Sequence, residues 1–321
     1  MKIVVIGLGS MGKRRIRLIN EIDKDIEIYG VDSNTERCKA ALEEFGIETY
    51  GDLNKAIDEE KPDSVFVCTS PLSHRAIIEC LLDKDVYVFT ELNLVRDGYE
   101  RFKNEDKLFL SSTFLYRDDI KWIINKISGE RVNYIYHTGQ YLPDWHPWED
   151  YRKYFVGDNK SNGCREIMAI EFPWLIRAFG EIEDVHTLAD KMSELEISYN
   201  DNYMLSVLHN NGTRGLIAVD VVSRNATRSL EVYNENLHVK WDGRPDSLVD
   251  FNLDKKEFEN IRVYENVQHR EGYSNNIIEN AYKAEIEAFF EYATGSKAAA
   301  LYDFKMDDMV LKLIDMIENV E

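Results

Sequence analysis

The first thirteen residues join a short apolar run to three glycines in GxGxxG spacing, and no other feature of the chain constrains the fold as strongly. Residues 3–6 predict a buried parallel strand, and a chain leaving such a strand needs a tight turn, which Gly7 permits. Gly9 lets a pyrophosphate approach the main chain, and Gly12 lets the next helix pack close to the strand. The N-terminus of that helix offers unpaired N–H groups to phosphates. We therefore predict a dinucleotide-binding turn made of Gly7, Gly9, Ser10, Met11 and Gly12.

An acidic residue after the second predicted strand narrows the choice of cofactor. Residues 26–31 form an apolar run, and Asp32 ends it about 20 positions after the glycines. A carboxylate in this place accepts hydrogen bonds from both hydroxyls of the adenosine ribose and repels a 2′-phosphate. Asp32 therefore favours NAD(H) over NADP(H).

Length, charge and cysteine content exclude several classes of protein. A chain of 321 residues is too long for one ordinary core, so two domains are expected. The net charge of −20 opposes binding to nucleic acid and to anionic membranes. No apolar stretch approaches the roughly 20 residues of a membrane span, and no signal-peptide pattern precedes the first strand, so we expect a cytoplasmic protein. The four cysteines lack CxxC spacing, which predicts free thiols and no metal site.

Strand and helix patterns alternate through the first third of the chain, which predicts an α/β domain with a doubly wound parallel sheet. Further strands are expected at 63–69 and 86–90. Ligands of such sheets bind beyond the carboxyl ends of the strands, so the residues that follow these strands should line one crevice with the glycine turn. They are Thr69, Pro71, His74 and Glu91. The alternative for His74 is a helix-start position that faces solvent.

The pattern changes near residue 116, where segments rich in β-formers begin and Asn210-Asn211-Gly212 gives a hairpin turn signal. These segments are 132–138, 184–188, 202–209, 213–222, 229–234 and 236–241. They predict an α+β domain with an open, mostly antiparallel sheet. Helical spacing follows at 282–292 and 306–318. The expected domains are 1–116, 117–300, and a C-terminal helix within 301–321 that packs back on the first domain.

With these elements the chain resembles the Gfo/Idh/MocA oxidoreductases, which join an NAD-binding Rossmann domain to an open-faced β-sheet domain. The resemblance covers nearly the whole chain. It rests first on the glycine motif at 7–12 and on residues 68–74 (CTSPLSH), where the family has a Thr/Pro/His loop. Residues 90–94 (TELNL) stand where the family has Glu-Lys-Pro-Leu. Residues 161–174 (SNGCREIMAIEFPW) stand at the place of the family's glycine-rich helix start. Residues 140–152 resemble a substrate loop of members associated with cell-surface sugar biosynthesis.

The chain departs from this family at the catalytic positions. Leu92 stands where the resemblance places a lysine, and Asn93 replaces the neighbouring proline. The family's catalytic aspartate and histidine fall near Ile167 and near Ile170 or Glu171. Because a positioned acid or base contributes roughly 10²–10⁴-fold, hydride transfer at an alcohol then needs another group to move the proton.

Three residues are candidates for that proton transfer. His146 suits a proton shuttle because an unperturbed histidine titrates near pH 6.5, and Tyr151 can donate to a carbonyl. Glu171 lies on the helix that carries the family's functional residues, where it is either a pocket carboxylate or a buried partner of an arginine. On the same helix, Arg165 and Glu166 can form a structural ion pair.

Other residues of the loop at 144–153 are candidates for substrate binding. Arg152 suits a carboxylate or phosphate through its planar fork, and Lys153 can donate to a carbonyl. Trp145 and Trp148 can stack on the apolar face of a sugar. The alternative is that the aromatic residues of this loop belong to a packed sheet edge and that His146 caps a turn.

These features predict an NAD(H)-dependent oxidoreductase of a sugar, nucleotide-linked sugar or polyol, with a role in surface-glycan biosynthesis. A second hypothesis, favoured by Leu92, is a catalytically silent relative that binds NAD(H) and a sugar as a sensor or partner subunit. A third is a reductase of a conjugated substrate, of the kind represented by the related biliverdin reductases. Relatives commonly pair through their exposed sheets, which implies a homodimer or homotetramer.

Overall fold

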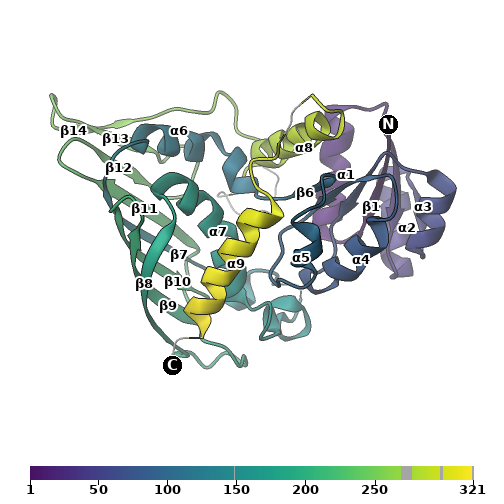
Figure 1. The fold of residues 1–321 in the computed structure, drawn as a ribbon, viewed down its shortest axis with the longest axis horizontal. Helices are drawn as coiled ribbons and strands as arrows, with labels where there is room; N and C mark the ends of the chain where they lie inside the picture. The colour runs from purple at the N-terminus through teal and green to yellow at the C-terminus, as the bar shows by residue number, and fades with distance from the viewer. Residues whose placement is uncertain (148, 269–276, 297–298, 320–321) are drawn as a thin grey trace. The chain divides into compact units, whose positions relative to one another are not determined.

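The computed structural model describes residues 1–147, 149–268, 277–296 and 299–319 (Figure 1). The chain divides into two compact units. The first takes in Met1–Thr113 and Tyr282–Met309, and the second takes in Phe114–Ala281 and Val310–Glu321. The chain thus enters the second unit close to the expected boundary at 116. The helix that we expected at 282–292, within the second domain, lies in the first unit.

The first unit contains the predicted parallel sheet, which in the described residues has six strands in the order β3-β2-β1-β4-β5-β6. The strands are β1 (Lys2–Ile6), β2 (Glu27–Val31), β3 (Glu48–Tyr50), β4 (Ser64–Val67), β5 (Tyr87–Thr90) and β6 (Leu108–Leu110). The helices are α1 (Ser10–Ile22), α2 (Thr35–Phe45), α3 (Leu53–Glu60), α4 (His74–Leu81), α5 (Tyr99–Phe102) and α8 (Glu279–Ala293). The strand order reverses between β1 and β4, and ligands of doubly wound sheets bind at the carboxyl ends of the strands at such a reversal.

The core of this unit forms between the sheet and a helix that is distant in sequence. Residues 3–5 of β1 are fully buried, as expected of a parallel sheet covered on both faces. From α8, the Phe289 ring packs edge-on against Phe66, Phe89 and Phe109, with centroid separations of 5.1, 5.5 and 5.5 Å. This aromatic contact explains why α8 belongs to the first unit, although it follows the second sheet in sequence.

The second unit contains a mixed sheet, which in the described residues has eight strands in the order β14-β13-β12-β11-β7-β10-β9-β8. The strands are β7 (Asn133–Gly139), β8 (Ile182–Asp190), β9 (Asn202–His209), β10 (Arg214–Asp220), β11 (Thr227–Tyr233), β12 (His238–Trp241), β13 (Val249–Asn252) and β14 (Glu257–Asn260). β7 and β10 are parallel, and the other neighbouring pairs are antiparallel. The predicted α+β fold of the second domain, with its mostly antiparallel sheet, is therefore confirmed.

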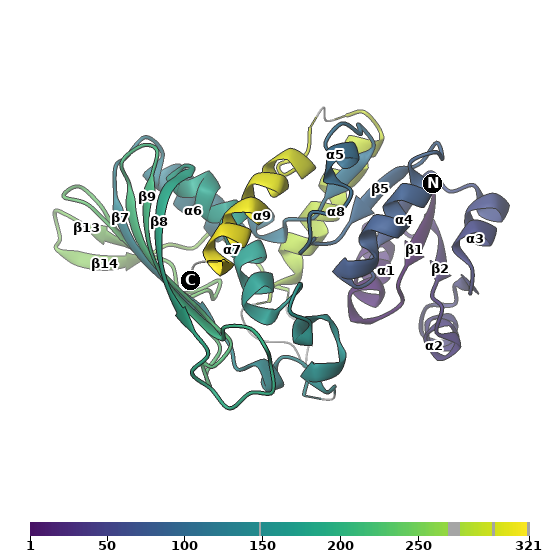
Figure 2. The same cartoon turned by 60° about the horizontal axis from the view of Figure 1, so that its bottom comes forward.

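The two faces of this sheet differ. The helices α6 (Asp118–Ile127) and α7 (Gly163–Phe179) lie on one side of it, and α9 (Phe304–Glu318) runs from the first unit into the second (Figure 2). Tyr134 of β7 stacks on Phe179 of α7 with ring centroids 4.0 Å apart, and Tyr136 packs edge-on against Trp174 at 5.4 Å. In the described residues no helix covers the opposite face (Figure 2). That open face exposes apolar side chains of β7 to β10.

Sequence patterns located six of the eight strands. β13 and β14 are the exceptions, because they are short and lack a buried apolar face; the β14 residues are mostly exposed. The predicted hairpin turn joins β9 to β10, with Gly212 at φ +83° donating its N–H to the carbonyl of His209 at 2.8 Å. No helix within the described ranges is long and apolar enough to cross a membrane.

Candidate functional site

The glycine turn forms a narrow cradle at the carboxyl end of β1. Gly7 has φ +89°, and a Cβ there would lie 2.8 Å from the main-chain carbonyl of Cys68. A Cβ on Gly12 would lie 1.9 Å from the carbonyl oxygen of Gly7. Among the described residues, a Cβ on Gly9 would meet only Arg37 Nη1, at 3.9 Å, so these residues leave this side of the turn open. The cradle therefore fits a pyrophosphate lying over Gly9 and the start of α1.

Asp32 is fixed beside this cradle. Its Oδ2 accepts a hydrogen bond from the Leu8 N–H, and its Oδ1 accepts one from the Asn34 N–H, both at 2.8 Å. Arg37 Nη1 lies 3.7 Å from Asp32 Oδ2, on a side chain that is 53% exposed. Two main-chain donors thus fix the orientation of the Asp32 carboxylate, while Arg37 adds a positive charge at the same edge. Its contact with the ribose hydroxyls of NAD stays a prediction.

The loop after β4 adjoins the glycine turn. Thr69 Cγ2 lies 2.9 Å from where a Cβ on Gly7 would stand, and the loop continues as a 3-10 turn, Pro71–Ser73, in which Pro71 is buried. The His74 ring is 2% exposed, with Nε2 3.0 Å from the Thr69 carbonyl oxygen and Nδ1 2.6 Å from Asn93 Oδ1. Burial lowers the pKa of His74. The solvent-facing alternative for His74 is therefore wrong, and its ring ties this loop to the segment after β5.

Glu91 is held by a buried arginine. Arg15, which is 0% exposed, donates Nε to Glu91 Oε1 at 2.6 Å and Nη2 to Glu91 Oε2 at 3.1 Å. The same Nη2 donates to Glu285 Oε2 at 2.8 Å, and burial raises the pKa of Glu285. Because Arg15 binds both oxygens of Glu91, these hydrogen bonds support a structural role for this carboxylate. A direct contact between Glu91 and the cofactor stays a prediction.

Glu171 of α7 is saturated with hydrogen-bond donors. Its Oε1 accepts from Nε and Nη2 of Arg228 at 2.9 and 2.7 Å, and its Oε2 accepts from Tyr136 Oη and Trp174 Nε1, both at 2.6 Å. The residue is 1% exposed. Of the two alternatives for Glu171, this geometry supports the buried partner of an arginine. A catalytic role requires one of these donors to leave, and it stays a prediction.

Most of the predicted substrate residues after β7 are engaged in surface contacts. Arg152 donates Nε and Nη2 to Asp150, each at 2.8 Å, and also pairs with Glu196. Tyr151 Oη accepts a hydrogen bond from the Glu196 N–H at 3.1 Å. The Lys153 side chain is 79% exposed, and its Nζ lies 3.8 Å from Asp150 Oδ2. The structure thus brings Tyr151 and Arg152 together through Glu196, whereas Lys153 extends into solvent.

His146 and Trp145 lie earlier in the same loop. Trp145 is half-buried, and its Nε1 donates to the carbonyl of Gln140 at 3.0 Å. The His146 ring stacks on Tyr154, with centroids 5.2 Å apart and an interplanar angle of 11°. Trp148 lies outside the described residues.

Two side chains with buried polar atoms, neither of which the sequence analysis assigned to the site, lie in this part of the second unit. Within the described residues, Glu166 Oε2 in the first turn of α7 and Tyr154 Oη have no hydrogen-bond partner. Burial raises the pKa of Glu166 to about 8 and, with the charge of Glu166, also raises the pKa of Tyr154. The expected ion pair between Arg165 and Glu166 is wrong, because Arg165 binds Asp315 at 2.6 Å instead. No sequence signal marks such a carboxyl, since its burial depends on the tertiary fold.

The group made of His146, Tyr154 and Glu166 has the chemistry of a proton donor. A carboxyl that titrates near pH 8 is protonated at neutral pH and can release its proton, and a neutral tyrosine can donate to a carbonyl.

In the described part of the chain, no cluster of three or more His, Cys, Asp or Glu side chains is placed to hold a metal ion.

Comparisons with known proteins identify the first unit. The model of the family described as "Oxidoreductase family, NAD-binding Rossmann fold" (Gfo/Idh/MocA) matches residues 1–94. The inositol 2-dehydrogenase/D-chiro-inositol 3-dehydrogenase of Lacticaseibacillus casei is 31% identical over 111 residues, which are 33% of this chain and 32% of that protein. The match thus spans about a third of the length of the curated relatives. The predicted NAD-binding Rossmann domain is confirmed.

Solved structures share the fold of nearly the whole chain. The UDP-N-acetylglucosamine 3-dehydrogenase of Acidithiobacillus ferrooxidans has a TM-score of 0.78 at 16% identity, over 99% of this chain and 96% of that one. A levoglucosan dehydrogenase in complex with NADH and L-sorbose has a TM-score of 0.79 at 15% identity, over 99% of this chain and 95% of that one. At such identities these likenesses establish the two-part fold.

Proposed function

We propose that this chain is a member of the Gfo/Idh/MocA family of oxidoreductases and acts as an NAD(H)-dependent oxidoreductase of a sugar, a nucleotide-linked sugar or a polyol. The observation that carries the proposal is the open side of the glycine cradle at Gly9 with Asp32 fixed beside it. NAD, when bound, accepts or supplies the hydride. The glycine turn and the N-terminus of α1 hold the pyrophosphate, Asp32 orients the ribose, and other side chains exchange a proton with the substrate.

The substrate class rests on what similar proteins act on or contain. Inositol, UDP-N-acetylglucosamine and L-sorbose, named for three of them, share a carbon skeleton that carries several hydroxyl groups. A substrate of this polyhydroxylated class is therefore proposed here. Within that class, the loop at 140–152 favours a nucleotide-linked sugar of surface-glycan biosynthesis, with Arg152 and Lys153 as the cations for its phosphates.

The proton of the reaction needs a source other than position 92. The second unit offers the group of His146, Tyr154 and Glu166. His146 is the accessible member, with a side chain that is 40% exposed. Glu166, whose Oε2 is buried, has a pKa raised to about 8, and Tyr154 stacks against His146. A relay in which Glu166 resupplies the proton that His146 or Tyr154 gives to the substrate requires an intervening water, because Glu166 Oε2 and Tyr154 Oη have no hydrogen-bond partner among the described residues.

Steady-state kinetics with NAD⁺ and a panel of sugars, polyols and UDP-sugars tests this function. His146→Ala and Glu166→Gln should each lower kcat by roughly 10²-fold or more, since acid and base groups act on the chemical step. The affinity for NADH should change little in either variant. Lys160→Ala, at an exposed position, is the matched control and should be neutral. A wild-type protein that binds no NADH would overturn the proposal.

A catalytically silent NAD(H) and sugar binder is the second candidate function, and the segment after β5 favours it. Leu92 cannot move a proton, and Oδ1 of the adjacent Asn93 lies 2.6 Å from His74 Nδ1. If the chain is such a silent binder, the wild type should bind NADH and a sugar but show no turnover at any pH between 5 and 10. Turnover comparable to that of ordinary dehydrogenases, roughly 1 s⁻¹ or more, would exclude this candidate.

A further inference from the structure

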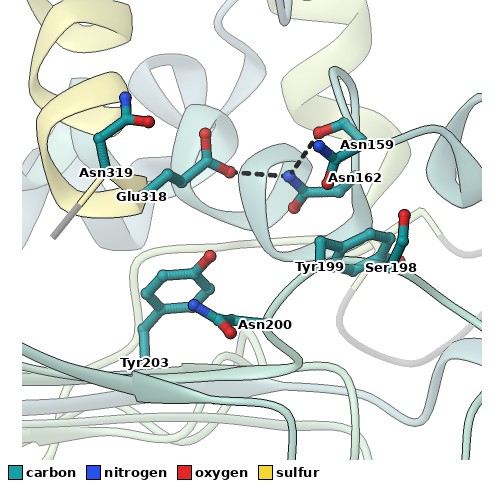
Figure 3. A pocket seen from close by; sticks show the side chains of 8 residues that line it. All are labelled: Asn159, Asn162, Ser198, Tyr199, Asn200, Tyr203, Glu318 and Asn319. Carbon is teal, nitrogen blue, oxygen red and sulfur yellow. Dashed lines mark hydrogen bonds between the residues drawn. The ribbon is translucent and has the colours of Figure 1, made fainter. Parts of the chain in front are cut away.

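A polar pocket of about 340 Å³ lies in the second unit, between the start of α7, the segment leading into β9 and the end of α9 (Figure 3). Asn159 and Asn162 contribute from the chain before α7, Ser198, Asn200 and Tyr203 from the segment before β9 and its start, and Glu318 from α9. Its volume falls in the range of small-molecule sites, roughly 300–1,000 Å³.

The pocket wall is held in place by hydrogen bonds. Asn162 caps α7, accepting a hydrogen bond from the Arg165 N–H at 2.7 Å, and its Nδ2 donates to Glu318 Oε1 at 2.7 Å and to the Asn159 carbonyl at 3.2 Å. Tyr199, also in the wall, donates its hydroxyl to the Val156 carbonyl at 2.7 Å. A ligand therefore meets groups that are already ordered, and little conformational entropy is lost when it binds.

The pocket has no net charge to offer a ligand. Among the described residues of the wall, Glu318 is the one carboxylate, and it pairs with the guanidinium of Arg165. An anion such as a phosphate would face this carboxylate, and the described wall residues include no lysine or arginine. A metal ion would find a single carboxylate that is already paired. A charged ligand is therefore disfavoured.

The remaining wall chemistry matches hydroxyl groups. The amides of Asn159 and Asn200 can offer donors and an acceptor oxygen to a ligand, whereas the amide of Asn162 is already used within the wall. The hydroxyls of Ser198 and Tyr203 both donate and accept. In Figure 3 the Tyr203 hydroxyl points toward Glu318 and Asn162, and the ring lies beside Asn200. Sugar hydroxyls are likewise both donors and acceptors, and an aromatic ring gives an apolar surface to the C–H face of a sugar.

From this wall we infer that the pocket binds an uncharged monosaccharide or cyclic polyol. This inference goes beyond the proposed function, because binding here involves neither NAD nor hydride transfer. The site is carried by the second unit alone.

The test uses the full chain without NAD, titrated with myo-inositol, D-glucose and D-glucuronate by isothermal calorimetry and saturation-transfer NMR. The two neutral probes should bind, and D-glucuronate should bind at least about tenfold more weakly, because its carboxylate meets Glu318. Ser198→Trp, which adds a large ring to the wall, and Asn200→Leu, which removes an amide, should each weaken binding of the neutral probes by at least tenfold. Asn236→Leu, at an exposed turn between β11 and β12, is the control and should leave binding unchanged.

The inference fails if neither neutral probe binds, or if both pocket variants, shown to be folded by circular dichroism, bind the probes as the wild type does. NADH titration of the same variants separates this inference from the proposed function. Loss of NADH binding in the wild type contradicts the proposed function, whereas unaltered sugar binding in the pocket variants contradicts the inference only.

Discussion

The carboxylate of Glu171 on α7 is bound by the guanidinium of Arg228 on β11, through hydrogen bonds of 2.9 Å from Nε and 2.7 Å from Nη2. Both side chains are largely buried, at 1% and 17% exposure. Removing one partner of such a pair leaves an uncompensated charge, so Glu171→Ala and Arg228→Ala should each lower the free energy of unfolding by about 3–5 kcal/mol. The double variant should lose less than the sum, because both lose the same contact. Urea unfolding measures all three.

A contrary result for Glu171 is equally informative. If Glu171→Gln unfolds at the same urea concentration as the wild type but has lost turnover, then the carboxylate acts in catalysis and the structural role is secondary. Because Glu171 also accepts hydrogen bonds from Tyr136 and Trp174, we expect Glu171→Gln to lower the stability of the fold more than it lowers turnover.

The position of Asp32 predicts a preference for NADH. The wild type should bind NADH at least about tenfold more tightly than NADPH, since the carboxylate accepts from the ribose hydroxyls and repels a 2′-phosphate. Asp32→Ala should narrow this gap, because it also releases Arg37, now 3.7 Å from Asp32, to attract the phosphate. In the double variant Asp32→Ala with Arg37→Ala, the affinity for NADPH that Arg37 adds should be lost again. Calorimetric titration with both cofactors decides, and equal affinities in the wild type would refute the role of Asp32.

Glu166 predicts a pH-dependent stability. Its pKa is about 8 in the folded chain against an ordinary 4.5, so between these values the folded state keeps a proton that the unfolded state has lost. The contribution is therefore fully present below about pH 4.5 and is lost as the pH rises through about 8, at about 1.4 kcal/mol for each pKa unit. Glu166→Gln should match the wild type at pH 5 more closely than at pH 9, where the variant should be more stable. If the free energies of unfolding of the wild type and of Glu166→Gln, measured with urea, changed in parallel with pH, then Glu166 would not be protonated at neutral pH.

Position 92 separates an active site from a silent one. If the site is silent because Leu92 replaced a lysine, Leu92→Lys should create or raise NAD⁺ reduction with a sugar panel. If another group already moves the proton, the same change should leave turnover unchanged or lower it, because a half-buried ammonium adds a desolvation cost. Leu92→Met is the matched control for side-chain length. A rise in turnover with Leu92→Met as well would exclude the ammonium as the cause.

The open face of the second sheet predicts a homo-oligomer. Met204, Leu216 and Ile135 are 60%, 55% and 45% exposed there, and Leu216 pairs directly opposite Ile135 in the register of β10 and β7. Exposed apolar side chains gathered on one surface mark interaction sites. We expect a dimer or tetramer by light scattering, and Leu216→Lys with Met204→Lys should shift it toward the monomer. Leu42→Lys is the control, because Leu42 is exposed on α2 of the first unit, and it should leave the oligomeric state unchanged. A monomeric wild type would contradict the prediction.

Local sequence was sufficient for the features that depend on neighbouring residues. The glycine spacing at 7–12 and the position of Asp32 follow from the geometry of one strand, one turn and one helix, and both are where the sequence placed them. The alternating strands of the second unit were also found, because alternation reflects one buried and one exposed face. β14 was missed, since a short strand with exposed polar residues carries no such pattern.

The sequence by itself determined the fold class and the dinucleotide site, whereas the partners of the buried charged groups were decided by tertiary structure. Arg15 meets Glu285 across 270 positions, Arg228 meets Glu171 across 57, and Asn162 meets Glu318 across 156. Whether a carboxylate such as Glu166 is free to titrate or Glu171 is locked by donors depends on which distant side chains surround it. Burial and hydrogen bonding set the energies of charged groups, and only the folded chain brings those contacts together.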